Sequence, residues 1–448
     1  MSHRLNRLGL LAFRVFRGSL LAVLAMIVLV PRARANPEIP GPPQEKPIAI
    51  VGATIHPVSG PAIEGGTLVF DKGKIVAVGK DVMPPADAEV IRLEGKHVYP
   101  GLFDAGTNLG LVEINSVRAT IDVQETGQLN PNVRAVVAVN PDSEIIPVTR
   151  SNGVLLAQVV PQGGLISGKS GIIQLDGWTW EDLALSRETG MYVEWPRVLR
   201  RLSRLESRPD QPNIDENMKR LRTAFEDARA YAAARKADEN YPIDARWEAM
   251  QPVLEGKLPL IARADDAATI QSAVAFAAEH KLKLIIHGGY DAPLVAAHLE
   301  QHDIPVIVAG VYRVPQRRGD DYDAPYTLPE RLRAAGIRFC ISSAGRFGAS
   351  NVRNLPYHAA TAAAYGLPAD EALKSITLSP AQILGVADRV GSLEAGKDAT
   401  LFIADGDILE TPTQVESAYI QGRKVELNDR HKRLYHKYSE KYERLEKP

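Results

Sequence analysis

Side chains that could do chemistry lie at the ends of apolar, strand-like runs in this chain. Asp104 and Asn108 belong to the stretch YPGLFDAGTNLGL, residues 99–111, and His287 ends the run LKLIIH. Alternate residues of a strand face the same side, so a barrel strand here would point Asp104 and Asn108 toward one site. A histidine at a strand end suits general acid–base work, and we take His287 as the candidate catalytic residue. The stretch is built like the approach to a metal site, yet it contains no histidine.

A planar cation and two hydroxyls could act at the same site. Arg263, in LPLIARADD, has a guanidinium that matches a carboxylate, and we expect it to pair with Asp104 in a metal-free pocket. Together with Asn108, these two are the candidate substrate-binding residues. Ser342 and Ser343, in FCISSAG, are the hydroxyls expected nearby, so a hydrolase with a serine nucleophile is the alternative chemistry.

Other polar clusters are predicted to be structural. His298 and His302 are four residues apart on a predicted helix, a spacing that suits metal ligation, but this helix should face away from a barrel. The aspartates of QRRGDDYDAPY, residues 316–326, favour a polar surface loop over a lid or a calcium-binding turn. The glycine-rich PQGGLISGKSG, residues 161–171, predicts a tight turn at the site, in which Lys169 could mimic a carboxylated lysine ligand.

The middle of the chain alternates strand-like and helical patterns. This alternation indicates βαβ units and a parallel sheet covered on both faces, and a closed barrel or an open sheet would fit it equally well. The strand-like runs are GVLLAQVV, KLPLIARADD, LKLIIHGG, IPVIVAG and IRFCISS, with helical patterns such as AATIQSAVAFAAEHK between them.

The two chain ends have a different texture. Short β-branched runs punctuated by glycine turns occupy residues 48–98 and return in residues 386–427, so we expect the two segments to pair in one small sheet domain. The charged residues 196–240 predict a solvated insertion of two helices with a proline-rich break. Residues 428–448 predict an exposed basic helix with tyrosines on one side.

The first residues resemble an export signal. Residues 1–35 combine arginines, the apolar run SLLAVLAMIVLV and small residues before Asn36, which predicts a cleaved secretory signal followed by a proline-rich linker at 36–47. We therefore expect an exported, periplasmic or extracellular protein without stable membrane insertion after cleavage; a retained anchor is the alternative. The 53 Lys and Arg nearly balance the 54 Asp and Glu, so no nucleic-acid partner is expected. Cys340 is predicted to be a buried, inert thiol.

Longer ordered motifs resemble a known family. The opening DKGKIVAVG, the turn YPGLFDAGTN, the block RNLPYHAATAAAYGLPADEALKSITLSPAQILGVADRVGSLEAGKDATLFIADGD and the closing AYIQGRKV are similar to the imidazolonepropionase-like secreted branch of the amidohydrolase superfamily. The resemblance implies a (β/α)8 barrel, which we place at residues 99–385, with a composite β-sandwich from both chain ends. It also implies hydrolysis of a C–N bond with zinc or another divalent metal.

The metal ligands that the resemblance implies are mostly replaced. Gly106 and Asn108 occupy the positions of the family's first His-x-His pair, and Arg263 occupies the place of a later histidine. His287 stands where the family often has a histidine, whereas serines replace the final aspartate around FCISSAG. A hydrolytic zinc needs about three protein ligands, so no metal cofactor is predicted.

Two functions follow from this reading. The first is an amidohydrolase-like protein with a degraded metal centre, in which any remaining reaction would be hydrolysis of a cyclic or linear amide by His287. The alternative is a non-catalytic exported binding or scaffold protein, a pseudoenzyme that uses the pocket at the barrel mouth. Either would take a small, amide-like ligand, and the resemblance makes a homodimer, or pairing with an intact paralogue, an expectation.

Overall fold

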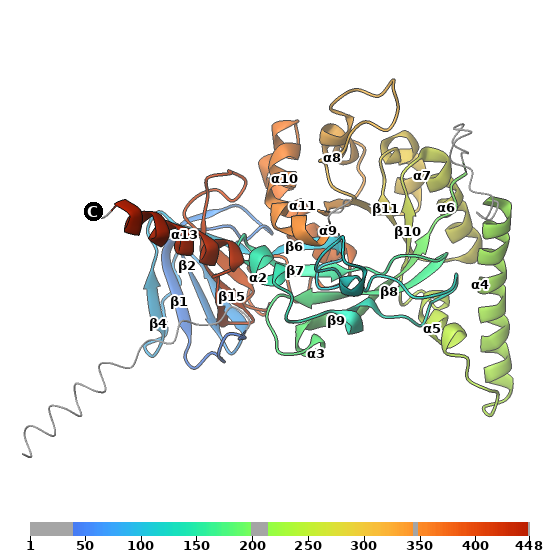
Figure 1. Cartoon of the computed structure of the whole chain (residues 1–448), viewed down its shortest axis with the longest axis horizontal. Helices are drawn as coiled ribbons and strands as arrows, with labels where there is room; N and C mark the ends of the chain where they lie inside the picture. The colour runs from blue at the N-terminus through green and yellow to red at the C-terminus, as the bar shows by residue number, and fades with distance from the viewer. Residues whose placement is uncertain (1–38, 199–213, 344–347, 447–448) are drawn as a thin grey trace, which may run out of the picture. The chain divides into compact units, whose positions relative to one another are not determined.

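The computed structural model describes residues 39–198, 214–343 and 348–446 (Figure 1). The predicted signal, residues 1–35, lies outside this part of the chain, as does most of the first helix predicted within 196–240. Residues 39–47 reach the first strand without regular structure. None of the helices within the described ranges has the length and apolar character needed to cross a membrane.

One sheet is built from both ends of the chain. Strand β5 pairs antiparallel with β14, which places Tyr99 opposite Phe402 with their rings stacked 5.4 Å apart. The order is β16-β15-β14-β5-β1-β2-β3, and β4 pairs with β1. Its strands are β1 (Ile48–Ile55), β2 (Ile63–Asp71), β3 (Lys74–Gly79), β4 (Glu89–Arg92), β5 (His97–Pro100), β14 (Leu401–Ala404), β15 (Val415–Ile420) and β16 (Arg423–Val425). The composite sheet predicted from the two β-rich ends is confirmed.

The second sheet is the predicted barrel. Its order is β6-β7-β8-β9-β10-β11-β12-β13, and its β6–β7 pair and all pairs from β9 to β13 are parallel. The strands are β6 (Leu102–Thr107), β7 (Val154–Val159), β8 (Ile166–Gln174), β9 (Ala184–Glu194), β10 (Leu260–Ala264), β11 (Leu284–Gly288), β12 (Val306–Val308) and β13 (Phe339–Ile341). The (β/α)8 class is therefore confirmed, with the departure that β8 runs antiparallel to both neighbours.

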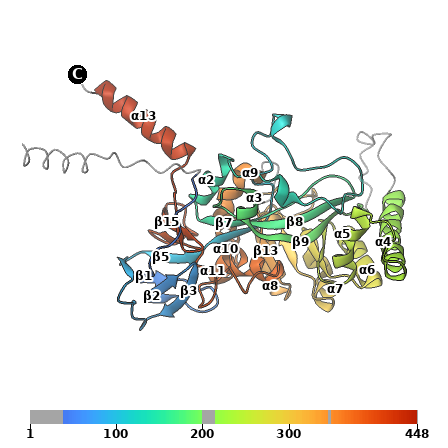
Figure 2. The same ribbon diagram turned by 90° about the horizontal axis from the view of Figure 1, so that it is seen from below.

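The antiparallel β8 corrects one sequence prediction. Residues 161–171 were expected to form a tight turn, but the turn is confined to their first part, and Ile166 begins a buried strand that lies beside β7 and β9 in both views (Figures 1 and 2). A Cβ on Gly168 would come within 2.9 Å of the Val133 carbonyl, and one on Gly171 within 2.8 Å of the Ser186 carbonyl. These glycines therefore permit close approach of neighbouring backbone rather than forming a turn.

Helices alternate with the later barrel strands, as the sequence pattern indicates. Helix α6 separates β10 from β11, α7 separates β11 from β12, and α8 separates β12 from β13. The helices are α2 (Ile145–Arg150), α3 (Trp180–Leu183), α4 (Ile214–Ala237), α5 (Ala245–Leu254), α6 (Ala267–His280), α7 (Ala296–Gln301), α8 (Ala324–Ala334), α9 (Gly348–Asn351), α10 (Leu355–Ala364), α11 (Ala369–Ser375), α12 (Leu378–Ile383) and α13 (Arg430–Glu446).

The described part of the insertion packs against the barrel helices. Helix α4 buries Leu221 and Phe225, and the Phe225 ring meets the Phe276 ring of α6 edge-on with centroids 5.2 Å apart. The prediction of a solvated helix is therefore wrong for this face of α4. The high charge of the segment favoured a solvated helix, although Ala224 and Ala228 of the same helix are also buried.

The barrel interior is filled by one layer of side chains with a cap beneath it. All eight strands contribute to this buried cluster, and residues of α12 and the segment after it close it from one end. The cluster contains Phe103, Ala105, Leu156, Val160, Ile172, Tyr192, Ile261, Ile285, Ile307, Cys340, Ala381, Leu384 and Val390. Because side chains alternate along a strand, residues two positions beyond this layer face the barrel axis at its carboxyl-terminal mouth. On β10 and β11 these residues are Arg263 and His287.

A buried ion cluster ties the barrel to the composite sheet. Asp176, which follows β8, pairs with Arg150 of α2 at 3.3 Å and with Arg423 of β16 at 3.1 Å. It also accepts a hydrogen bond from the backbone N–H of Gly41. Arg150 and Asp176 are each only 3% exposed, so neither charge has water as an alternative partner.

We predict that Asp176→Ala lowers the free energy of unfolding by about 3–5 kcal/mol, because it leaves the buried Arg150 without its carboxylate. The matched control is Glu416→Ala, which removes an exposed ion pair with Lys96 and should cost less than about 1 kcal/mol. Urea unfolding of the two variants measures both values. Equal losses would mean that the cluster does not join the two sheets.

Candidate site at the barrel mouth

The imidazole of His287 lies over the position that a side chain on residue 106 would occupy. A Cβ built on Gly106 would lie 2.7 Å from Cε1 and 3.2 Å from Nε2 of His287. Gly106 is not among the residues with positive φ, so its backbone does not require a glycine. The close approach of His287 is what excludes a side chain, and the first ligand position of the family pattern is filled by the ring of another residue.

A buried hydrogen-bonded network holds His287. Its Nδ1 lies 3.1 Å from the hydroxyl of Tyr192, which also lies 3.3 Å from Oε1 of Gln158. The amide of Gln158 donates in turn to the hydroxyls of Ser170 and Thr189. All five side chains are buried. Such a network fixes the imidazole in one orientation.

Burial keeps the His287 imidazole neutral. The side chain is 4% exposed, and desolvation, reinforced by the positive charges of Arg263 and Arg313, lowers its pKa well below the ordinary value. A base with a strongly lowered pKa has little driving force to take a proton. His287, the predicted catalytic residue, is therefore a neutral imidazole hydrogen-bonded to Tyr192. This state suits a structural role better than acid–base catalysis.

Arg263 pairs with a residue that the sequence analysis did not consider. Its Nε lies 2.9 Å from Oε1 of Glu194, its Nη2 donates to the carbonyl of Pro161, and its guanidinium lies 5.1 Å from the Tyr192 ring centroid. In the sheet register Arg263 stands between Glu194 on β9 and His287 on β11. The predicted Arg263–Asp104 pair is therefore wrong, because a nearer carboxylate on the adjacent strand takes the charge.

Asp104 closes the seam of the barrel. One carboxylate oxygen accepts from the backbone N–H of Gly106 at 3.0 Å, and the other accepts from both the N–H and the hydroxyl of Ser343. Asp104 is fully buried, and desolvation raises its pKa, against the opposing effect of these hydrogen bonds. Ser343 follows β13, so the two bonds from Ser343 join β13 to β6 across the closing edge, whereas the bond from Gly106 lies within β6.

The hydroxyls do not form a serine–histidine pair. Ser343 donates to Asp104, and the hydroxyl of Ser342 donates to the carbonyl of Val308 at 3.1 Å. Neither bond involves His287. The alternative of a serine nucleophile activated by this histidine has no geometric support in the structure.

Asn108 presents a buried acceptor at the mouth. Its side-chain oxygen has no hydrogen-bond donor within the described ranges, and a Cβ on Gly348 would lie 2.7 Å from it. Leaving a buried acceptor unpaired costs about 1–3 kcal/mol. A ligand that donates an N–H to this oxygen would recover that energy.

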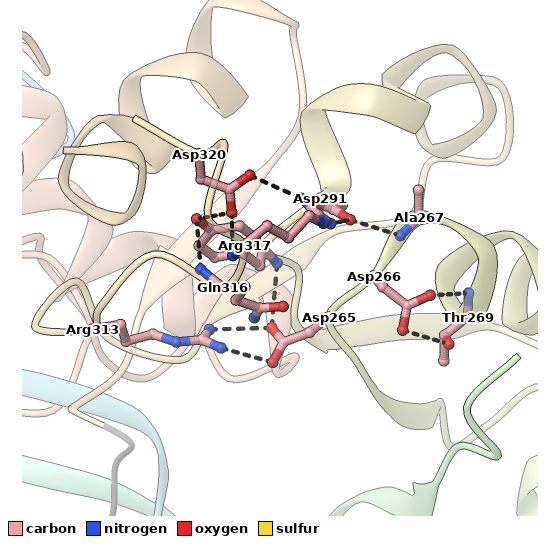
Figure 3. Close-up of polar contacts among 10 residues, drawn as sticks. Asp265, Asp266, Ala267, Thr269, Asp291, Arg313, Gln316, Arg317 and Asp320 are labelled. Carbon is pink, nitrogen blue, oxygen red and sulfur yellow. Dashed lines mark hydrogen bonds and ion pairs between the residues drawn. The ribbon is translucent and has the colours of Figure 1, made fainter. Parts of the chain in front are cut away.

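A cluster of ion pairs fixes the loop after β12 to the strand ends of the mouth (Figure 3). Arg313 binds both carboxylate oxygens of Asp265, at 3.1 and 2.7 Å, directly after β10. Arg317 pairs with Asp291, after β11, and with Asp320 of its own loop. The polar loop predicted at 316–326 is present and anchored over residues 316–323, and residues 324–326 instead begin helix α8; the carboxylate of Asp320 is engaged by arginine.

The residues at the mouth do not fit the divalent metal of the family. Gly106 offers no donor atom, Asn108 offers a weak neutral oxygen, and Arg263 carries a permanent positive charge that repels a dication. Within the ranges that the structure describes, no three His, Cys, Asp or Glu side chains are arranged to share a metal ion. Lys169 does not substitute for a ligand either, because it forms an ion pair with Glu188 at 2.6 Å. His298 and His302 lie exposed at α7.

Three functional side chains escaped the sequence analysis. Gln158 lies on β7, which was recognised as a strand without attention to its polar residue. Tyr192 and Glu194 lie on β9, which was not recognised as a barrel strand. The available signal was the run MYVEW, an apolar strand-like segment ending in a carboxylate. Glu194 in that run occupies the same level of the mouth as Arg263 and His287.

Comparison with known proteins agrees with the barrel fold. A model of the amidohydrolase family matches residues 326–425. Imidazolonepropionase from Mesorhizobium japonicum is 25% identical over 386 residues, covering 79% of this chain and 88% of that protein. Amidohydrolase tasK from Hapsidospora irregularis is 23% identical over 390 residues. The match covers 80% of this chain but only 39% of the length of tasK.

Solved structures show the same relationship. The crystal structure of an amidohydrolase from Thermotoga maritima superposes with a TM-score of 0.76 and 25% identity, covering 85% of this chain and 99% of that one. A prolidase structure, with a TM-score of 0.52 and 17% identity, shares the fold. The fold and site thus define an amidohydrolase-type barrel. The family model, the relatives and the solved structure together support the amidohydrolase superfamily, imidazolonepropionase-like, as the motifs predicted.

We predict that Gly106→Ala destabilises the protein by about 1–3 kcal/mol, because the new methyl group meets the His287 ring. In a His287→Ala background the same substitution should cost close to nothing. Gly60→Ala is the control, since that glycine has open space around it. Urea unfolding of the four-variant cycle measures the coupling, and an additive cycle would show that the ring does not fill this position.

We predict that the stability contributed by neutral His287 falls as the pH decreases. Its folded pKa is lowered, so the unfolded state, with a pKa of about 6.5, binds more protons below that value. The wild type should therefore lose up to about 1.4 kcal/mol per pH unit relative to His287→Gln as the pH falls from 6.5 to 5. A pH-independent difference between the two unfolding curves would contradict this assignment.

Proposed function

We propose that this protein is a non-hydrolytic member of the amidohydrolase superfamily that binds a small, amide-like ligand at the barrel mouth without a divalent metal. The single observation that carries the proposal is the packing of His287 into the space beside Gly106. This packing fills the place of a metal ligand with a ring that is itself buried and hydrogen-bonded. The homology to hydrolases supports the fold, and the substituted residues support the loss of the family reaction.

The surroundings of the mouth supply donors and acceptors for a polar neutral ligand. The buried oxygen of Asn108 lacks a donor among the described residues, which suits an amide N–H. A cavity of about 460 Å³ lies beside the mouth rather than over it: Asp122, Asn132, Arg134 and Pro161 line it, and Asn108 and His287 do not. Both the acidic and the basic groups at this cavity suit a ligand with polar ends rather than a purely apolar one.

The rival function is hydrolysis of a C–N bond by His287 without a metal. It is weaker, because the lowered pKa of His287 and the separate engagement of Ser342 and Ser343 leave no activated nucleophile or base. Export to the periplasm or the extracellular space, predicted from residues 1–35, is part of the proposal for the native protein.

The test is metal binding together with turnover. We expect the chelator-treated protein, dialysed against zinc and analysed by elemental mass spectrometry, to retain well below one equivalent, with an unchanged thermal midpoint. We also expect no hydrolysis of imidazolonepropionate or of Xaa-Pro dipeptides above the level of His287→Ala. One equivalent of zinc that is lost in His287→Ala, or turnover that this variant abolishes, would overturn the proposal in favour of a hydrolase.

Ligand binding is measured on the same protein. A library of small cyclic and linear amides, screened by thermal shift, should yield a ligand whose affinity falls about tenfold in Asn108→Ala, the loss expected for one hydrogen bond to a buried acceptor. Glu416→Ala is the matched control, because it lies on the composite sheet. Hits with equal affinity for Asn108→Ala would place binding elsewhere.

A further inference from the structure

Helix α13 exposes an apolar stripe along its whole length. Leu434, Tyr435, Tyr438, Tyr442 and Leu445 are between 40% and 70% exposed, and no residue of the helix is buried. At 3.6 residues per turn these five side chains fall within an arc of about 100° on one face. The remaining residues of α13 are charged or polar, and all of them except His431 lie outside this arc.

A helix of this kind needs a partner. Isolated helices of about this length are marginal in water, and most helices in proteins are stabilised by packing an apolar face. The attachment of α13 to its own chain is confined to its first turns: Asp429 caps its backbone N–H groups, and Arg433 pairs with Glu144 at 2.9 Å. The tyrosine stripe begins where these contacts end.

The spacing of the stripe suits pairing of two helices. Tyr435, Tyr438, Tyr442 and Leu445 are separated by three, four and three residues, the repeat of a coiled-coil seam. In an antiparallel pair Tyr435 would meet Leu445 of the other helix, and Tyr438 would meet Tyr442. Tyrosine suits such a seam, because its ring packs against the other helix while its hydroxyl remains in contact with water at the edge.

Charge complementarity selects the direction of the pair. Residues 430–437 carry four Lys or Arg and no acid, whereas residues 438–446 carry Glu440, Glu443 and Glu446 against two basic side chains. A parallel pair would set the basic halves side by side. An antiparallel pair sets each basic half against the half of opposite net charge and brings Lys432 close to Glu446 of the second copy.

We propose that the exposed face of α13 is an interface with a second copy of this chain, formed by antiparallel pairing of the two helices. This interface is independent of the barrel mouth and of what the mouth binds. The partner is the α13 of the second copy, because one helix carries both the apolar seam and two halves of opposite net charge.

The first test is the oligomeric state of the full chain by sedimentation velocity. The wild type should be a dimer, and the triple substitution Tyr435→Ser, Tyr438→Ser and Tyr442→Ser should be a monomer with an unchanged unfolding curve. The matched control carries Lys437→Ser, Glu440→Ser and Arg444→Ser on the opposite face and should remain a dimer. A monomeric wild type, or a dimer that survives the tyrosine substitutions, would overturn the proposal.

The second test reads the direction of the pair. Lys432→Glu and Glu446→Lys should each weaken the dimer at least about fivefold, and the double variant should recover it. A mixture of Tyr435→Cys and Leu445→Cys chains should form a disulfide between copies, because these positions face each other in the antiparallel pair, whereas Tyr435→Cys alone should not. Cross-linking of Tyr435→Cys alone would indicate a parallel pair and overturn the antiparallel interface.

A third measurement separates a protein partner from a lipid surface. Vesicles of phosphatidylcholine with phosphatidylglycerol should not bind the wild type more strongly than the tyrosine variant. A monomer that floats with these vesicles through the tyrosines would overturn the dimer and assign the stripe to an anionic membrane surface.

Discussion

The barrel depends on a buried carboxylate at its seam. The ladder of backbone hydrogen bonds that joins the other strands does not run between β13 and β6 in the sheet order, and Asp104 instead accepts two hydrogen bonds from Ser343 there. A carboxylate that accepts bonds from Gly106 and Ser343 fixes the first and last strand ends in register. The mouth is built on those ends, so the positions of Gly106 and of everything packed over it follow from this closure.

In the proposed metal-free mouth, side chains take over the charge balance that a divalent ion would provide. A divalent metal would gather histidine and carboxylate ligands around one positive charge. Here the positive charge is a guanidinium, Arg263, balanced by Glu194 on the next strand. The ring of His287 fills the central space beside Gly106 and is oriented by Tyr192. Arg263 and Gly106 thus remove donor atoms, and the Glu194 ion pair and the His287 ring provide the charge balance and the packing at the mouth.

Much of the fold was predictable from the sequence because parallel strands are buried on both faces and read as near-continuous apolar runs. The runs ending at Arg263 and His287 were recognised for this reason, and the strand–helix alternation gave their parallel order. The strand β8 was missed because Gly168 and Gly171 resemble turn residues, although they serve close backbone packing. The Glu194 partner of Arg263 was missed for a related reason, since it depends on which strands become neighbours. A hydrogen bond between strands far apart in sequence leaves no local pattern.

The composite sheet gives this protein a long-range dependence between its two ends. Strand β5 finds its partner β14 only after roughly three hundred further residues, including the entire barrel, have been made. During synthesis the amino-terminal strands therefore wait with an open edge, and such non-local pairing is slow and exposed to association with other chains. The pairing of β14 with β5 is consequently the step that completes the sheet begun by the amino-terminal strands. A chain that stops before β14 would leave an unfinished sheet edge at the opposite end of its sequence.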